Sequence, residues 1–367
     1  MKIATFNIQN LFYRNRELLQ KNRSKNAADW IAELDMLLRK YPKGRGDSNR
    51  INDLSCLLGF DKMEDMPYAI LKNKAGELCF TKQGFRNTAK ASFLTDWEGW
   101  VKVANGPLHE KAVFSKAYVI AETDPDVLIL QEVEDRASLM EFNTEFLPLL
   151  KISPYQEVMA FETNDPRGMG MGLMLKNGYR LNGVKNHLYD LDADGLALFN
   201  MDCQEYEIGT PDGDTIWVLS NQFSLDDVQR KKQAEKVAKI YNRMRSEGKM
   251  VLVCGTLNDV SYSHALSPLI RETDLKDISR HGRFKTDTDQ GRDGSYFRLG
   301  AYRLGVNIKQ KDYLLLPPYW FEKVQKAGMN RKGTWPDRKP NWALYPSIGG
   351  KHHAASEHPL VWGEIDL

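Results

Sequence analysis

The stretch Asp126-Val-Leu-Ile-Leu-Gln-Glu132 decides the expected fold. Its run of four apolar residues predicts a strand that is covered on both faces, as in the middle of a layered protein. A predicted helix at residues 112–122 comes before it, and Thr123-Asp-Pro125 ends that helix. The strand finishes on the polar pair Gln131-Glu132, and layered α/β folds place their sites at such strand ends.

Predicted strands and helices of the same kind occur along the chain on both sides of this stretch. Further strands are predicted at residues 2–6, 170–175, 205–208, 215–219, 250–254, 312–316 and 360–365, and further helices at 135–147 and 226–245. Strands interleaved with helices, some of them joined by hairpins, indicate mixed β-sheets covered by helical layers.

Composition is that of an ordinary globular protein. Of the 367 residues, 42% are hydrophobic and 27% are charged, and the net charge is +2. This balance disfavours an avid nucleic-acid binder, although nucleic acid stays possible as a substrate if a local basic cleft exists. The four cysteines, Cys56, Cys79, Cys203 and Cys254, show no CxxC spacing and are expected to be buried in a reducing compartment.

The chain has no apolar run long enough to span a bilayer. A predicted strand begins at Lys2, which leaves no room for a signal peptide, so we expect a cytoplasmic protein. A chain that began after a removed leader would look the same.

Residues 14–95 differ from the rest. They contain a charge-rich helical pattern at 27–38 and Gly/Asp-rich loops around 44–47. We interpret them as an insertion in a single domain that spans residues 1–367. The sequence leaves open whether the insertion is a lid, a partner-binding surface or decoration.

Polar side chains recur where predicted strands end. Asn7, Glu132, Gln222, Asn258 and His358 each follow an apolar strand or precede one directly, and Asp312 begins another strand. A single such residue means little, because Asn and Asp often end strands. Five in one chain predict a shared polar site.

These residue types suit phosphoester chemistry. Glu132 can hold Mg²⁺, which prefers oxygen ligands and is usually bound by one or two carboxylates together with a substrate phosphate. Asn7 and Asn258 can contact phosphate oxygens without adding negative charge. His358 can stabilise charge that builds on phosphorus, and Asp312 would fix its tautomer and raise its pKa.

The order and spacing of these motifs resemble the endonuclease/exonuclease/phosphatase superfamily, the deoxyribonuclease I-like proteins. The matching motifs are Phe6-Asn7, Asp126 to Glu132, Asp165-Pro-Arg-Gly168, Arg230-x-x-Gln233, Gly255 to Asn258, Asp312-Tyr313 and Ser356 to Pro359. They span residues 1–13 and roughly 97–367, and they leave 14–95 unexplained.

The resemblance implies an α/β fold: a four-layer sandwich of two packed mixed β-sheets flanked by helices. It implies a divalent cation, Mg²⁺ or Mn²⁺, and hydrolysis of a phosphoester by in-line attack of water. The cation is expected to be weakly bound, because Gln9 stands where an acidic residue is usual. The roles it implies are catalysis for His358, Asp312, Asn258 and Asn7, substrate binding for Gln222, Arg167 and Thr256, and metal binding for Glu132, Glu357 and Gln9.

Four positions depart from the superfamily pattern. Thr256 replaces the aspartate that serves as general base or orients water, and loss of a general base typically costs ~10²–10⁴ in rate. Gln222 stands where many members have histidine, Gln9 where an acid is usual, and Glu357 where the motif has aspartate. Each change is expected to weaken metal-assisted hydrolysis.

Three functions therefore remain open. The first is a metal-dependent phosphoester hydrolase with weakened activity, and the second is an inactive relative that binds a phosphate ligand or a partner. The third is a scaffold that acts through residues 14–95. A basic and aromatic loop at 331–353 is compatible with ligand stacking or with simple packing onto the core. The substrate class and the oligomeric state are beyond what the sequence decides.

Overall fold

The computed structural model describes residues 1–15, 27–40, 42–58, 69–75, 78–81, 99–103, 105–165, 167–286, 302, 308–336 and 342–367. The chain divides into two compact units. The first comprises Met1–Phe12, Leu108–Asp165 and Met169–Leu367, and the second comprises Tyr13–Pro107 and Pro166–Gly168. The predicted insertion, residues 14–95, falls inside the second unit.

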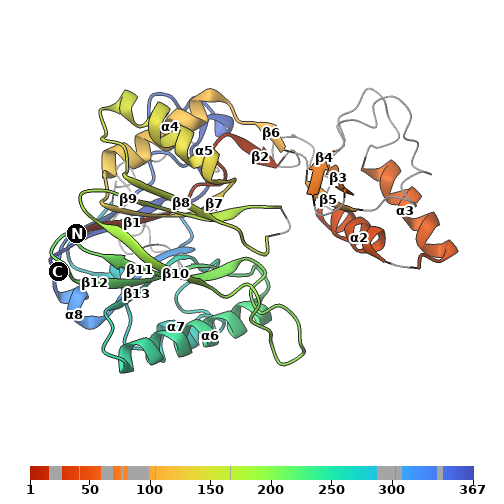
Figure 1. The fold of residues 1–367 in the computed structure, drawn as a ribbon. Helices are drawn as coiled ribbons and strands as arrows, with labels where there is room; N and C mark the ends of the chain where they lie inside the picture. Colours follow the sequence, from red (N-terminus) through yellow and green to blue (C-terminus); the bar gives the residue numbers. More distant parts are fainter. Residues whose placement is uncertain are drawn as a thin grey trace. The chain divides into compact units, whose positions relative to one another are not determined.

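The first unit is built on two β-sheets (Figure 1). The strands of one sheet are β1 (Lys2–Asn7), β7 (Val127–Val133), β8 (Glu157–Phe161), β9 (Gly170–Leu175), β15 (Phe284–Lys285), β17 (Val324–Asn330) and β18 (Leu360–Ile365). Their spatial order is β15-β17-β18-β1-β7-β9-β8. The strands of the other sheet are β10 (Arg180–Asn186), β11 (Asp202–Gly209), β12 (Thr215–Gln222), β13 (Val251–Thr256), β14 (Lys276–Asp277) and β16 (Asp312–Leu316). Their order is β10-β11-β12-β13-β16-β14.

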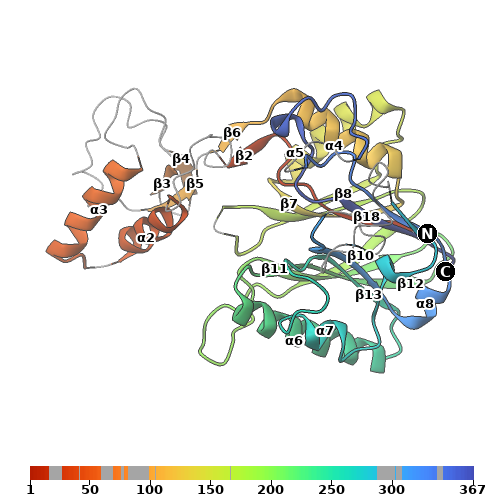
Figure 2. The ribbon, with the colours of Figure 1, turned by 180° about the vertical axis from the view of Figure 1, so that it is seen from behind.

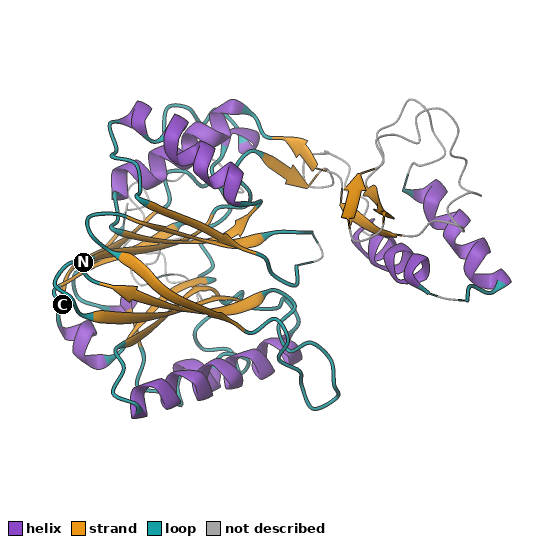
Figure 3. Cartoon of the chain, viewed as in Figure 1, coloured by secondary structure: helices purple, strands orange, loops and turns teal. Residues whose placement is uncertain are grey.

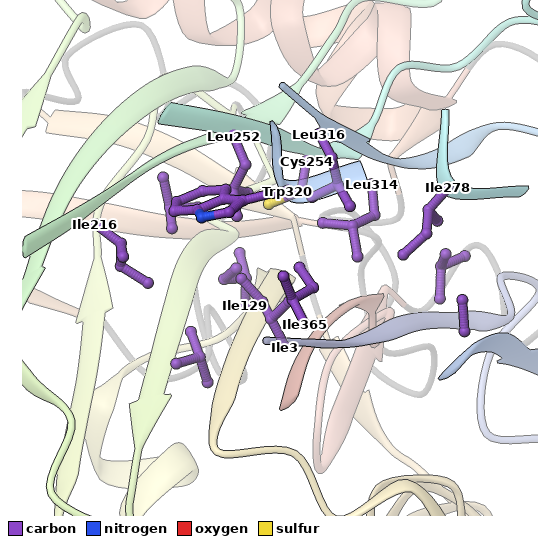
Figure 4. Close-up of a cluster of buried hydrophobic side chains, with 14 of the residues drawn as sticks. Ile3, Ile129, Ile216, Leu252, Cys254, Ile278, Leu314, Leu316, Trp320 and Ile365 are labelled. Carbon is purple, nitrogen blue, oxygen red and sulfur yellow. The ribbon is translucent and has the colours of Figure 1, made fainter. Parts of the chain in front are cut away.

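The two sheets pack face to face through apolar side chains. Ile3 and Ile129 from one sheet meet Leu252, Cys254 and Leu314 from the other in one buried cluster (Figure 4). β1 and β7 are buried along nearly their whole length, which explains why the run Val127–Leu130 of β7 is continuously apolar rather than alternating.

Helices cover the outer face of each sheet (Figure 3). On one side lie α4 (Glu110–Thr123), α5 (Arg136–Glu141) and the short turns η2 (Phe142–Phe146) and η3 (Pro148–Leu150), and on the other lie α6 (Asp227–Ser246) and α7 (Ser267–Ile270). The remaining short helices of this unit are η4 (Ile278–Arg280), α8 (Pro318–Glu322) and η6 (Lys351–His353). The order helix, sheet, sheet, helix confirms the predicted four-layer sandwich (Figure 1 and Figure 2).

Strand direction brings distant motifs to one end of the sandwich. β1 and β7 are parallel, with Asn7 opposite Gln131, and β12 and β13 are parallel, with Gln222 opposite Thr256. β16 runs antiparallel to β13, so its first residue, Asp312, lies opposite Thr256. Polar residues from five strands are thereby brought to one end of the sandwich.

The second unit contains a two-stranded antiparallel sheet of β2 (Tyr13–Asn15) and β6 (Asn105–Pro107), the helices α2 (Ala27–Arg39) and α3 (Arg45–Leu57), and a sheet of β3 (Ala69–Ala75), β4 (Leu78–Thr81) and β5 (Gly99–Val103). The helix predicted at 27–38 is confirmed. The expectation of a loop at 44–47 was wrong, because α3 begins at Arg45. The Asp47 carboxylate accepts a hydrogen bond from Gly44 N at 2.8 Å and closes the first turn, while Ile51 and Leu54 are buried.

Cysteine burial differs in part from expectation. Cys203 and Cys254 are buried in the sandwich, but Cys56 is exposed on α3. The α3 sequence is mostly polar, so the helix buries one face only and leaves Cys56 on the other. The side chain of Cys79 lies outside the described residues. Among the helices that the structure describes, none combines the length and apolar character needed to cross a membrane.

Candidate functional site

A chain of hydrogen bonds joins the two sheets at the strand ends described above. Asn7 Nδ2 donates to Thr256 Oγ1 at 3.2 Å, and the Thr256 hydroxyl donates to Asp312 Oδ1 at 2.8 Å. His358 Nδ1 lies 2.9 Å from both oxygens of the Asp312 carboxylate. All four residues are buried, so four segments that are far apart in sequence form one polar network.

His358 and Asp312 form a buried ion-pairing dyad. A carboxylate can only accept, so Nδ1 of His358 carries the proton of this bond and Nε2 is the nitrogen left for a ligand. Burial lowers the pKa of His358, but attraction to Asp312, the hydrogen bond between them and the charge of Glu132 outweigh it and raise the pKa above the usual value. The imidazolium that could stabilise a phosphate is therefore favoured.

Glu132 and Gln222 form a second link between the sheets. Gln222 Nε2 donates to Glu132 Oε1 at 2.7 Å, and both side chains are buried. Glu132 has φ +60°, a left-handed conformation that side chains other than glycine rarely adopt. The pairing of β7 with β9 is shifted at this point, between Gln131 and Val133. A bulge at a strand end commonly re-aims a side chain toward a site.

The Ser356–His358 segment is tied to the end of β1. Ser356 Oγ donates to Asn7 O at 2.7 Å and accepts a hydrogen bond from His358 N at 3.1 Å. Gln9 Oε1 accepts a hydrogen bond from Glu357 N at 2.8 Å. Ser356 was not among the predicted site residues, although its place as first residue of the Ser-Glu-His-Pro motif was the available signal.

The network leaves two predicted site residues, Asn258 and Arg167, untested. Asn258 Nδ2 donates to Phe223 O at 2.7 Å, which holds the loop after Gln222. Arg167 belongs to the second compact unit, so the structure does not place it relative to the network. Their predicted roles stay predictions.

The Arg230-x-x-Gln233 motif holds the same loop. Arg230 Nε donates to Ser224 O at 2.9 Å, and Gln233 Oε1 accepts from Ser224 N at 2.7 Å. Arg230 also pairs with Asp259 at 2.9 Å. This motif therefore positions the backbone that follows Gln222.

The described part of the basic and aromatic loop is packed. Arg331 is fully buried and its guanidinium lies over the Trp342 ring at 4.4 Å, while Lys332 pairs with Glu122. These contacts favour the packing interpretation for those residues. Residues 337–341 of the loop lie outside the described residues.

The donor set bears on the predicted cation. Glu132 is the predicted metal ligand whose carboxylate is buried in the site, whereas the Glu357 carboxylate is about half exposed and pairs with Lys351 at 3.0 Å. The Gln9 amide oxygen faces Glu357 N. Among the residues that the structure describes, no group of three His, Cys, Asp or Glu side chains is arranged to hold a metal ion. A single carboxylate ligand fits a cation that binds together with the substrate phosphate. It does not fit a metal site formed by protein ligands alone.

Comparisons with solved structures find proteins of similar fold. An endonuclease/exonuclease/phosphatase family protein from Bacteroides thetaiotaomicron is 14% identical, with a TM-score of 0.47 over 70% of this chain and 89% of that one. A mannosyl-6-phosphatase from the same organism is 11% identical, with a TM-score of 0.47 over 70% and 90%. The human Nocturnin catalytic domain is 16% identical, with a TM-score of 0.45 over 70% and 87%. No protein-family model matches the sequence, and neither does any curated protein.

Proposed function

We propose that this chain is a divergent member of the endonuclease/exonuclease/phosphatase superfamily and that its site binds and slowly hydrolyses a phosphoester with the help of Mg²⁺ or Mn²⁺. The observation that carries the proposal is the network of Asn7, Thr256, Asp312 and His358, which joins both sheets at the strand ends. The ordered motifs of the sequence support the same superfamily.

Each residue has a task that its contacts allow. His358, held by Asp312, presents a protonated imidazole to a phosphate oxygen and stabilises the charge that develops there. Asn7 and Gln222 contribute uncharged amide groups beside it. Glu132 would hold the cation together with the phosphate. A bound divalent cation polarises the phosphoryl group and lowers the pKa of a coordinated water.

Thr256 explains why the proposed hydrolysis is slow. Its hydroxyl already donates to Asp312 and accepts from Asn7, and a threonine hydroxyl takes up no proton near neutral pH. The site therefore lacks the general base of its superfamily at this position, with an expected rate penalty of ~10²–10⁴.

The same observation favours a second function. Without a base at position 256, the site can bind a phosphate-bearing ligand without turning it over. Hydrolysis and binding then need to be measured separately, because a bound phosphoester is common to both functions.

One experiment separates the two. Hydrolysis of bis(p-nitrophenyl) phosphate is followed with Mg²⁺ or Mn²⁺ and with EDTA, for the wild type, Glu132→Ala and Thr256→Asp. Metal-dependent turnover by the wild type that Glu132→Ala abolishes supports the hydrolase. Binding of inorganic phosphate without turnover, with hydrolysis gained only in Thr256→Asp, supports the binding module. Neither binding nor turnover in any variant would overturn both.

A further inference from the structure

Three non-glycine residues with left-handed backbone meet at the end of β7. Gln9 has φ +48°, Asn10 has φ +66° and Glu132 has φ +60°. Such conformations persist only where the surrounding structure holds them, and they gather at functional sites. Asn10 N donates to Glu132 O at 2.7 Å, and Ile8 N donates to Gln131 O at 3.0 Å. The turn at residues 8–12, which we call the site turn, is thus fastened to the strand that carries Glu132.

One carboxylate closes the site turn. Leu11 N donates to Glu134 at 2.7 and 2.6 Å, one distance to each carboxylate oxygen, and Phe12 N donates to Glu134 Oε1 at 2.8 Å. Two successive N–H groups after a left-handed pair form a concave binding place for an anion, and here the anion is part of the chain. Val133 is buried in the core next to Glu134, which anchors this carboxylate at the strand end.

The site turn also holds the segment that carries His358. Gln9 Oε1 accepts a hydrogen bond from Glu357 N at 2.8 Å and lies 3.3 Å from Ser356 Oγ. Ser356 Oγ accepts from His358 N at 3.1 Å. Hydrogen bonds at both ends of the site turn, joined by the backbone of residues 9–11, therefore connect Glu134 with the segment that carries His358.

We infer that Glu134 is a positioning residue of the candidate site, which fixes the site turn and through it sets the places of Glu132 and His358. This inference rests on the proposed function only for the chemical roles of Glu132 and His358. A carboxylate is required because both oxygens face N–H donors, and an amide at this position would turn an NH₂ group toward one of them.

Hydrogen exchange of the full chain, measured by mass spectrometry, tests this inference in Glu134→Gln. Exchange is expected to rise about tenfold or more at residues 8–12, since hydrogen bonds to a charged acceptor are lost. It is also expected to rise at 356–358, while β12 and β13 keep wild-type exchange. Glu141→Gln, an exposed glutamate on α5, is the matched control and should change neither segment. Where the wild type hydrolyses a phosphoester, kcat should fall in Glu134→Gln and not in Glu141→Gln.

A rise confined to Leu11 and Phe12, with wild-type exchange at 356–358, would overturn the inference. If Glu134→Gln does not fold, the variant Gln9→Ala is measured instead. The inference requires faster exchange at residues 356–358 with unchanged exchange at residues 11–12. Unchanged exchange at 356–358 with faster exchange at 11–12 would contradict it. If the wild type neither binds nor hydrolyses a phosphoester, the proposed function fails. The exchange data still report on the positioning role in that case.

Discussion

The hydroxyl of Thr256 donates a hydrogen bond to Asp312 Oδ1 at 2.8 Å and accepts one from Asn7 Nδ2 at 3.2 Å. An aspartate at this position would place a second carboxylate beside Asp312, and the two would share a proton or repel each other. Threonine supplies both a donor and an acceptor, so it satisfies both neighbours but takes up no proton near neutral pH.

Thr256→Val should test this link, because valine keeps the shape and removes the hydroxyl. Both Asn7 and Asp312 then lose a buried partner, and we expect the free energy of unfolding to fall by about 1–3 kcal/mol. Chemical denaturation measures this, with Thr256→Ser as the variant that keeps the hydroxyl. Equal stability of Thr256→Val and the wild type would show that the network is not stabilising.

The raised pKa of His358 predicts a pH dependence of phosphate binding. The imidazolium is present below the raised pKa, so affinity for inorganic phosphate should fall as the pH rises through it. Asp312→Asn removes the carboxylate that favours the imidazolium, and the loss of affinity should move to lower pH. Titration calorimetry at several pH values measures both, and an unchanged profile in Asp312→Asn would contradict the dyad.

Glu132 is the predicted metal ligand with a buried carboxylate, and this predicts that cation and phosphate bind together. Mn²⁺ alone should bind weakly, and its affinity should rise at least about tenfold when phosphate is present, because phosphate oxygens complete its ligand set. Glu132→Gln should remove the increase, and Glu141→Gln should not. Tight binding of Mn²⁺ without phosphate would contradict this description of the site.

Asp202 on β11 predicts a stability change with pH that is separate from the site network. Burial raises the pKa of its carboxyl to about 6, although hydrogen bonds from His187 N and Cys203 N oppose the shift. Folding therefore favours the protonated form. The stabilising contribution is complete below the usual pKa near 3.8 and is lost as the pH rises through about 6.

In Asp202→Asn this pH dependence should disappear. At pH 8 the variant should be more stable than the wild type by up to about 3 kcal/mol, and the difference should shrink as the pH falls toward 4. Thermal unfolding across this pH range measures it. A difference that stays constant from pH 4 to pH 8 would contradict the raised pKa.

The layers of the fold were predictable because apolar runs such as residues 126–132 and 360–365 report burial directly. The site ends of β1, β7, β13 and β16 could be anticipated for the same reason, since polar residues follow the apolar runs of the first three strands and Asp312 precedes that of β16. The hydrogen-bond partners of the site residues were not predictable, because the contacts of Gln222 with Glu132 and of Thr256 with Asn7 depend on how the two sheets stack. The role of Glu134 depends on a backbone turn that no side-chain pattern reveals, whereas the place of Ser356 in the Ser-Glu-His-Pro motif was a signal that the predictions did not use.

A crystal structure of the full chain grown with Mg²⁺ and inorganic phosphate would decide whether the strand ends around His358 form the phosphate site. We expect phosphate beside His358 Nε2 and the Asn7 amide, with the cation on Glu132. Phosphate and cation bound on other surfaces, with the network of Asn7, Thr256, Asp312 and His358 untouched, would contradict it.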